Sequence, residues 1–346
     1  MRLWLSRKRL RILALLICGT GVSVLLLEIS LRLLGRPPLG QFGRPANEPL
    51  LWEVEPVTGM HRKRVGRFRF PGYSPGAADI VRTIWPDGTR ATAPEPREGL
   101  KSVLFVGCSM TEGAGVSDDE TFPWKVQTQF PDLAVKNRGV AGFSTLHTLL
   151  DLRRALTQSR VDLVVYGFIP DHERRNVASA DWQHVLRVAS PLERIWLRGD
   201  FDPRGSLIVQ PERIVAWPGA RTLATVNAVQ QLWDQAMAAS RTSRAAETTR
   251  QLILLMREEL RVQGADLLVV ALAPFPSPAY AEFFGEHRIS AIECPINNGG
   301  NRKEFVVKGE GHPNGRAHSQ YAACISAELS RRPLGQHRAM LGPGPS

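Results

Sequence analysis

Ser109 stands in a short segment whose residue types suit nucleophilic chemistry. An apolar run, Val103–Val106, predicts a buried strand that breaks at Gly107 into a turn of small residues. Open α/β sheets place their functional groups at the carboxyl ends of strands. A hydroxyl exposed in such a turn lies beside free backbone N–H groups, which can hold a developing oxyanion. Ser109 is therefore our candidate nucleophile.

A serine hydroxyl is a weak nucleophile at neutral pH and needs a base. Of the eight histidines, His312 has the best setting, because it follows Glu310 by two residues and precedes the last predicted helix. A carboxylate beside an imidazole can orient the ring and stabilise its protonated form. We expect His147, in an amphipathic helix, to be structural. We expect the other six to lie on the surface: His61, His172, His184, His287, His318 and His337.

The elements around these residues alternate between strand and helix from residue 101 onward. The predicted strands are Lys101–Gly107, Ala134–Asn137, Val161–Phe168, Ala265–Leu272 and Ile289–Cys294. The predicted helices are Asp119–Phe130, capped by Asp118 or Asp119, Ser144–Gln158 and Gly315–Ser330. Strands separated by helices predict an α/β domain with a parallel sheet and right-handed crossovers, spanning residues 101–332.

Three other regions depart from this rhythm. Residues 171–245 read as an insertion over one end of the sheet, with a hairpin within Leu207–Trp217. Residues 36–100 read as a linker and a small β extension, whose strand-like pieces are Arg67–Phe70 and Asp79–Trp85. Residues 333–346 are rich in Gly and Pro and are expected to be disordered.

Residues 1–35 predict a cytoplasmic basic flank followed by a transmembrane signal anchor. Basic residues precede an apolar stretch, Ile12–Leu27, which Glu28 interrupts before apolar sequence resumes. A cleaved signal peptide needs a small residue at its cleavage site, which Leu25–Leu27 lacks, and a lipoprotein signal needs a small residue before Cys18, where Ile17 stands. We therefore expect an uncleaved anchor in a bacterial inner membrane, with the rest of the chain outside the cytoplasm.

Charge and cysteine content exclude other classes. The net charge is +11, but residues 1–69 hold thirteen Lys/Arg against four Asp/Glu, so the excess lies at the amino end and not on a nucleic-acid recognition element. The four cysteines form no CxxC or Cys/His cluster, which argues against a zinc site. A Cys294–Cys324 disulfide and two buried thiols both remain open.

The chain resembles the GDSL/SGNH hydrolase family over about residues 101–330. Gly107-Cys108-Ser109 matches the first block, Asn137–Gly142 the second, Gly167–Asp171 falls where the third is expected, and Glu310–Asn314 resembles the fifth. The resemblance implies a flavodoxin-like three-layer α/β/α domain with a five-stranded parallel sheet. It also implies Ser109 as nucleophile, His312 as base, and an oxyanion hole built from the N–H groups of Ser109 and Gly142. No metal or organic cofactor is implied.

Three departures from the family pattern bear on the chemistry. Cys108 replaces the aspartate of the first block and is itself an alternative nucleophile. Pro170 replaces the third-block asparagine and has no N–H to donate, so the Asp171 or Asn176 region, or His172, would have to supply that oxyanion donor. Glu310 stands two residues before His312, where the family has an aspartate at three, so a Ser-His dyad is the alternative to a triad.

The resemblance implies an ester hydrolase that acts on O-acyl groups of carbohydrate or on lipid-like esters. An O-acyltransferase that modifies a cell-envelope polysaccharide would use the same chemistry. A degenerate, non-catalytic binding module is the alternative from another class. The sequence gives no indication of the oligomeric state.

Overall fold

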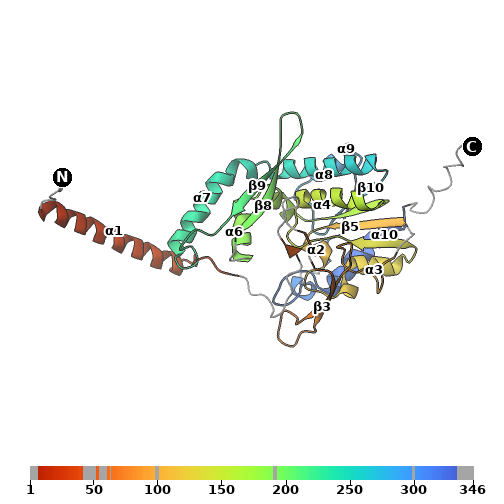
Figure 1. The fold of residues 1–346 in the computed structure, drawn as a ribbon, viewed down its shortest axis with the longest axis horizontal. Helices are drawn as coiled ribbons and strands as arrows, with labels where there is room; N and C mark the ends of the chain where they lie inside the picture. Colours follow the sequence, from red (N-terminus) through yellow and green to blue (C-terminus); the bar gives the residue numbers. More distant parts are fainter. Residues whose placement is uncertain are drawn as a thin grey trace, which may run out of the picture. The chain divides into compact units, whose positions relative to one another are not determined.

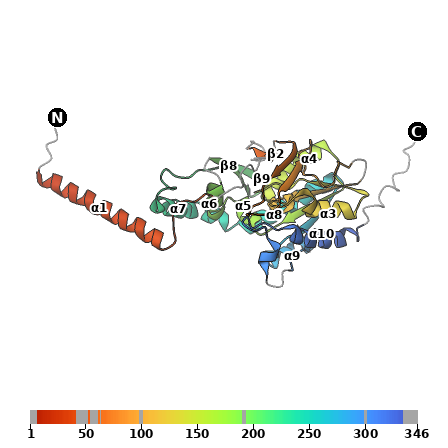
Figure 2. The same ribbon diagram turned by 90° about the horizontal axis from the view of Figure 1, so that it is seen from below.

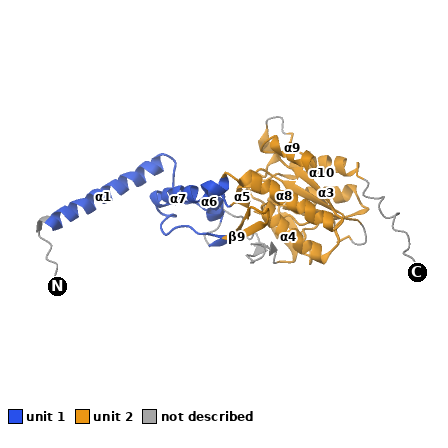
Figure 3. Cartoon of the chain, turned by 90° about the horizontal axis from the view of Figure 1, so that it is seen from above, with its two compact units in different colours: residues 1–43, 178–196, 212–242 blue, residues 44–177, 197–211, 243–346 orange. Residues whose placement is uncertain are grey.

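The computed structural model describes residues 7–41, 52–53, 61–62, 64–97, 101–189, 193–297 and 301–332 (Figure 1 and Figure 2). The chain divides into two compact units (Figure 3). Unit 1 comprises residues 1–43, 178–196 and 212–242, and unit 2 comprises residues 44–177, 197–211 and 243–346. Unit 1 thus joins the N-terminal segment to two parts of the predicted insertion. The domain boundaries inferred from sequence stay predictions, and the predicted tail at 333–346 lies outside the described residues.

The centre of unit 2 is a five-stranded parallel sheet with the order β11–β10–β7–β5–β6. Its strands are β5 (Lys101–Gly107), β6 (Leu133–Asn137), β7 (Leu163–Phe168), β10 (Asp266–Ala271) and β11 (Ser290–Glu293). Counted from β6, this is the flavodoxin-like strand order 2-1-3-4-5. Successive strands are added on one side of β5 and then on the other, so the topological switch point lies between β5 and β7. The predicted strands and the predicted three-layer α/β/α fold are confirmed.

Alternating side chains along the strands build two apolar layers. Leu104 and Val106 of β5 join the layer beneath α4 (Thr145–Gln158), α8 (Ala245–Val262) and α9 (Ala279–Glu286). Phe105, between them in sequence, points to the opposite face. There it meets Phe122 of α3 (Phe122–Gln129) at 5.7 Å between ring centroids, and Phe122 meets Tyr321 of α10 (Gly315–Leu329) at 5.8 Å. Figure 1 shows the α4 and α8 layer and the α3 and α10 layer on either side of β5.

The helix predicted over Asp119–Phe130 is two elements. A 3-10 helix, η1 (Asp118–Glu120), is closed by a capping box between Ser117 and Glu120. The α-helix α3 then starts at Phe122, and its cap is Thr121, whose hydroxyl accepts the N–H of Trp124 at 3.3 Å. The prediction of Asp118 or Asp119 as the cap was wrong. Pro123 fixes the new start, because its missing N–H is tolerated only in the first turn.

The hairpin predicted within Leu207–Trp217 was also wrong. Residues Leu207–Ile214 form a single strand, β9, which pairs with β8 (Arg194–Phe201) in a two-stranded sheet. The turn lies near Asp202, whose side chain accepts the N–H groups of Arg204 and Ser206 at 2.8 Å each. The alternation in 207–214 is therefore that of one strand, and its partner precedes it in the chain.

The predicted small β extension forms two strand pairs. Strands β3 (Gly66–Phe70) and β4 (Ile80–Ile84) pair antiparallel, close to the predicted strand-like pieces. Strands β1 (Trp52–Glu53) and β2 (His61–Arg62) form a second, shorter antiparallel pair. Most of the predicted linker between residues 36 and 60 lies outside the described residues.

Unit 1 contains helices α1 (Arg7–Leu33), α6 (Ala180–Ala189) and α7 (Ala224–Thr242). The segment Arg9–Leu33 has a mean hydropathy of 2.4 in its most apolar window and is long and apolar enough to cross a membrane. A signal sequence near an N-terminus meets the same criteria, so this is weak evidence for an anchor.

A disulfide joins Cys294, directly after β11, to Cys324 in α10, with 5.8 Å between their Cα atoms. It ties the edge strand to the last helix. The sequence left this pair open between a disulfide and two thiols. Among the described residues Cys18 and Cys108 are free, the first exposed and the second buried.

Candidate active site

The turn after β5 holds Ser109 at the beginning of a short helix, α2 (Ser109–Glu112). Gly107 has φ +145°, and a Cβ atom there would lie 2.6 Å from the Thr111 hydroxyl and 2.8 Å from the Gly167 carbonyl oxygen. Only glycine fits this position. The tight bend brings the Ser109 side chain to the carboxyl end of the sheet, next to the switch between β5 and β7.

His312 and Glu310 meet Ser109 in a continuous hydrogen-bond chain. His312 Nε2 lies 2.7 Å from Ser109 Oγ, and His312 Nδ1 bonds to Glu310 Oε1. The other carboxylate oxygen, Glu310 Oε2, accepts the backbone N–H of His312 at 2.8 Å. One carboxylate thus fixes both the ring and the backbone of the histidine, and the arrangement has the connectivity of a Ser-His-acid triad.

Glu310 can reach the His312 ring although only one residue separates them, because the loop turns sharply at Gly311. Gly311 has φ +92°, a conformation that L side chains rarely adopt. The Val307 N–H donates to the His312 carbonyl at 2.7 Å, which closes the loop. Asn314 then caps α10 by accepting the N–H of Arg316 at 3.1 Å. The loop that carries the base is therefore held at both ends.

The environment of Glu310 keeps it ionised. Burial by itself raises the pKa of this carboxyl. The hydrogen bond and the positive charge of the His312 ring, the His312 N–H and the charge of Arg82 outweigh burial and bring the pKa of Glu310 below its ordinary 4.5. A carboxylate that stays charged can stabilise an imidazolium at His312.

The loop after β6, which carries Gly142, is tied to the nucleophile turn. The Val140 N–H donates to the Gly107 carbonyl at 3.0 Å, and the Ala141 N–H donates to Glu112 Oε2 at 2.7 Å. The side chain of Asn137 donates to the Thr111 carbonyl at 3.0 Å. Asn137, the last residue of the predicted strand and the first of the second block, ends β6 and holds α2 in place.

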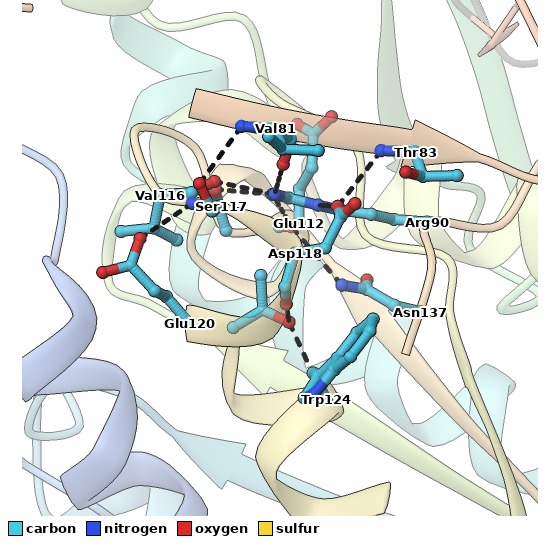
Figure 4. Close-up of polar contacts among 12 residues, drawn as sticks. Val81, Thr83, Arg90, Glu112, Val116, Ser117, Asp118, Glu120, Trp124 and Asn137 are labelled. Carbon is cyan, nitrogen blue, oxygen red and sulfur yellow. Dashed lines mark hydrogen bonds and ion pairs between the residues drawn. The ribbon is translucent and has the colours of Figure 1, made fainter. Parts of the chain in front are cut away.

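Arg90, which the sequence gave no reason to select, is the centre of a cluster of polar contacts around the segment that follows Ser109 (Figure 4). Its guanidinium is fully buried and bonds Asp118 at 2.8 Å. It also donates to the carbonyls of Glu112, Gly113 and Val116 at 2.9, 2.7 and 2.7 Å. These carbonyls follow Ser109 directly, so Arg90 holds the chain that leaves the nucleophile turn. No local pattern signals such a role, because its acceptors are backbone atoms.

In front of Ser109 lies a cavity of about 670 Å³ at the carboxyl edge of the sheet. Ser109, Glu310, His312 and Asp171 line it. Two arginines, Arg175 and Arg302, line it as well. The rest of the wall is mostly apolar and comprises Met110, Ile169, Pro170, Leu272, Ala273, Pro274, Pro295, Ile296, Phe305, Val306, Gly311, Pro313 and Tyr321. A volume of this size suits a small organic ligand.

Of the residues considered for the missing third-block donor, neither Asn176 nor His172 lines this cavity. The same region places Arg175 there instead. Asn176 is fully buried, and its amide donates to Thr145 and Thr249 at 3.1 and 2.8 Å. His172 is fully buried with Nδ1 2.6 Å from the Tyr166 hydroxyl. Neither lines the cavity among the described residues.

Arg175 connects the third-block region to the loop of Gly142. It belongs to α5 (Asp171–Asn176), and its side chain is 8% exposed. It donates to the carbonyl of Phe143, the residue after Gly142, at 3.0 Å. Its guanidinium lies 3.6 Å from the Asp171 carboxylate, which also accepts from Arg174 at 2.9 Å. The carboxylate of Asp171 is an acceptor, so its side chain cannot donate to an oxyanion.

Other candidate residues have different surroundings. Cys108 is fully buried and does not line the cavity, so its thiol has no access to a substrate there. His147 is structural, as predicted: it is buried beside the Ser144 hydroxyl at 2.7 Å, and burial together with the charge of Arg175 lowers its pKa to about 3. Within the described residues, no group of three or more His, Cys, Asp or Glu side chains has an arrangement that could hold a metal ion.

The expectation of surface histidines was wrong for two residues. His172 and His318 are both fully buried. His318 Nδ1 accepts the N–H of Phe122 at 3.2 Å, and burial lowers the pKa of the imidazole to about 3. A neutral imidazole can replace a backbone acceptor in a core, which a hydropathy pattern does not reveal. The side chains of His61 and His337 lie outside the described residues.

Comparison with known proteins found no family model and no curated protein that matches the chain. Among solved structures, the chain is similar to TesA, with 14% identity, a TM-score of 0.38, and coverage of 68% of this chain and 99% of that one. It is similar to a lipolytic protein of the G-D-S-L family from Desulfitobacterium hafniense, with 10% identity, a TM-score of 0.39, and coverage of 66% and 98%.

It is also similar to an acetyl xylan esterase from Geobacillus stearothermophilus, with 11% identity, a TM-score of 0.38, and coverage of 66% and 94%. Other solved structures similar to this chain are described as a G-D-S-L lipolytic protein and a GDSL-like lipase, the family that its sequence motifs resemble.

Proposed function

We propose that this protein is a serine hydrolase that acts on ester bonds through an acyl-enzyme, with Ser109, His312 and Glu310 as its catalytic residues. The observation that carries the proposal is the unbroken chain from Ser109 Oγ through both nitrogens of His312 to Glu310. A structural serine has no need of a histidine that a partly buried carboxylate orients, and the hydrogen-bond chain opens into a cavity of ligand size.

The first half of the reaction forms the acyl-enzyme. Ser109 Oγ attacks the ester carbonyl carbon while its proton passes to His312 Nε2. Glu310 stabilises the imidazolium that results. When the tetrahedral intermediate collapses, the bond to the alcohol oxygen breaks, and the alcohol leaves with the proton from His312. The second half repeats these steps with water, which releases the acid and restores Ser109.

The oxyanion of the intermediate needs donors, and we assign three. The backbone N–H groups of Ser109 and Gly142 are the first two; Ser109 lines the cavity, whereas Gly142 is not among its lining residues and is assigned from the sequence motif. Arg175 is the third, in place of the asparagine that Pro170 has displaced. In support, Arg175 lines the same cavity as Ser109 and is bonded to the loop of Gly142. A buried guanidinium is a strong donor to developing negative charge.

The lining of the cavity supports a substrate with an apolar acyl group. Its wall is mainly aliphatic and aromatic, with few polar groups besides the catalytic residues and the two arginines. We therefore place lipid-like esters and O-acylated carbohydrates with an apolar acyl group within the substrate class.

We further propose that α1 anchors the protein in a bacterial inner membrane and that the catalytic unit lies outside the cytoplasm. The length and hydropathy of Arg9–Leu33 suit a membrane span, and Arg9 and Arg11 at its amino end suit the cytoplasmic side. The Cys294–Cys324 disulfide suits an oxidising compartment.

A serine-reactive fluorophosphonate probe tests the enzymatic proposal. We expect labelling of the full-length protein and of Ser319→Ala, which changes an exposed serine of α10, but none of Ser109→Ala. Hydrolysis of p-nitrophenyl esters should fall by a factor of about 10⁴ or more in Ser109→Ala.

Two results would contradict the proposal. Absence of Ser109-dependent labelling in protein that circular dichroism shows to be folded favours the binding module. Labelling with transfer of the acyl group to a polysaccharide hydroxyl, without net hydrolysis, favours the acyltransferase.

A further inference from the structure

Helix α7 has its polar and apolar faces reversed with respect to a helix on a water-soluble surface. The side of α7 that is buried carries Asn227, Gln230 and Asp234. Each is engaged: Asn227 donates to the Pro37 carbonyl at 3.0 Å, Gln230 donates to the Val215 carbonyl at 2.8 Å, and Asp234 pairs with Arg187. The polar residues of α7 are therefore used inside unit 1.

The outward side of α7 is apolar. Four large side chains are about half exposed or more, at helical spacing: Val229 (49%), Leu232 (64%), Trp233 (55%) and Met237 (58%). Ala236 lies between them and is also exposed. We call these five residues the α7 stripe; it contains no charged residue. A contiguous apolar stripe on an exposed helix is typical of a surface that contacts another apolar phase.

The start of α7 is bonded to α1. The carboxylate of Glu28, the residue that interrupts the apolar run of α1, accepts the N–H groups of Ala224 and Thr225 at 2.9 and 2.8 Å and the Thr225 hydroxyl at 2.8 Å. Arg32, one turn further, donates to the Thr222 carbonyl at 2.8 Å. Glu28 thus caps the N-terminus of α7, where a negative charge is favourable.

These bonds fix the level of the start of α7 relative to any membrane that α1 crosses. The uninterrupted apolar part of α1 runs from Ile12 to Leu27, and a span needs about 20 residues. Residue 28 therefore lies near the end of the span, within about 10 Å of the end of α1 at Leu33, given a rise of about 1.5 Å per residue. Helix α7 begins at the boundary between hydrocarbon and headgroups.

We propose that α7 lies in the membrane interface and that the α7 stripe contacts the acyl chains of the bilayer. This inference rests on the proposal that α1 spans the membrane. It adds a second membrane contact to unit 1, the unit that contains α1. The lipid is favoured as the occupant because the stripe belongs to the helix that Glu28 caps at the membrane boundary. Trp233 has the amphipathic ring that gathers at this level, and Arg32, half exposed at the start of α7, suits a headgroup phosphate.

Fluorescence quenching by spin-labelled lipid tests this contact in the full-length protein. The probe variant is Ala236→Cys, which leaves the four large side chains of the stripe intact. The matched control is Gln235→Cys, exposed and adjacent but on the polar flank of the same helix. Both are made in a Cys18→Ser background, labelled with an NBD fluorophore and placed in nanodiscs of phosphatidylcholine and phosphatidylglycerol at a ratio of roughly 3:1, which supplies anionic headgroups. Cys108 is buried and the other two cysteines are joined.

An interfacial helix buries its apolar face by about 5–10 Å, so we expect a nitroxide high on the acyl chain to quench position 236 roughly twofold more than position 235. A separate label on the native Cys18, in the middle of α1, should be quenched by a nitroxide deep in the bilayer.

Equal quenching at 235 and 236 while Cys18 is quenched would overturn the inference about α7 and leave the anchor intact. Absence of quenching at Cys18 would contradict the anchor itself. Protection of position 236 from both lipid and an aqueous quencher would overturn the lipid contact in favour of a protein partner or a second copy of the chain.

Discussion

The two sides of Ser109 use buried arginines in different ways. Behind the serine, the guanidinium of Arg90 is completely enclosed and bonded to Asp118 and to four carbonyls. In front of it, Arg175 is nearly as buried but lines a cavity; it donates to the Phe143 carbonyl and lies beside Asp171. The network around Arg90 is closed and holds the backbone. Arg175 instead borders a cavity, where it can stabilise negative charge on a bound substrate.

This difference separates a structural role from a chemical one by access and not by residue type. A buried arginine that does not line a cavity, such as Arg90, cannot reach a substrate there. One that borders a cavity can share its charge with a transition state. The same test distinguishes His318, enclosed against Phe122, from His312, which faces Ser109. Variants on the two sides should accordingly fail in different ways.

The largest effect is expected at the front, from Glu310→Gln. The amide cannot stabilise the imidazolium, so kcat should fall by about 10³–10⁴ with little loss of folded protein. Steady-state hydrolysis of a p-nitrophenyl ester measures this. The control is Glu304→Gln, an exposed glutamate of η2 (Arg302–Phe305), which should keep full activity. A loss below about tenfold would identify the site as a Ser-His dyad.

At the rear, Arg90→Met should act on stability. Removing one partner of a buried ion pair typically costs about 3–5 kcal/mol, because Asp118 and the carbonyls lose their donor. Urea unfolding followed by circular dichroism measures it. Arg97→Met, an exposed arginine of the same segment, should leave the unfolding midpoint unchanged. An unaltered midpoint in Arg90→Met would remove the distinction between the two sides.

Arg175→Met should act on the rate. Loss of one oxyanion donor lowers kcat by about 10²–10³ while KM changes little, since the interaction forms in the transition state. The matched control is Arg174→Met, its neighbour, which also contacts Asp171 but does not line the cavity. If only KM rises, Arg175 binds substrate and does not stabilise the oxyanion. If both variants lose the same activity, the effect is that of Asp171.

The smallest effect is in the pH dependence of stability. The pKa of Glu310 is held below its ordinary 4.5 in the folded protein, so its ionised form favours folding. That contribution is complete above the unfolded value and is lost as the pH falls through the lowered pKa.

The difference in unfolding free energy between wild type and Glu310→Gln should therefore shrink as the pH falls below about 4.5. Urea titrations from neutral to acid pH measure it. A difference that grows toward acid pH would contradict the assigned direction.

Much of the fold was predictable because its signals are local. The strand at Lys101–Gly107 was predicted to the residue, since a buried parallel strand is a continuous apolar run. The helix at Asp119–Phe130 was predicted with the wrong start, because Asp118 and Thr121 are both residue types that cap helices. The structure places a separate 3-10 helix at Asp118–Glu120, and Pro123 sets the start of α3 after Thr121. The prediction of a hairpin within Leu207–Trp217 was wrong, because the pairing partner of a strand is set by tertiary contacts and not by local composition.

The sequence alone determined the candidate nucleophile, base and carboxylate, since Ser109, Glu310 and His312 stand at strand and helix ends that a parallel sheet brings to one edge. Only the tertiary structure decided the rest. In the tertiary structure Asn176 and His172 are buried, and Arg175 lines the cavity. Arg90 lies behind the nucleophile, and the polar side of α7 faces inward. These roles depend on backbone carbonyls and on enclosure from several elements at once, and neither leaves a pattern along the chain.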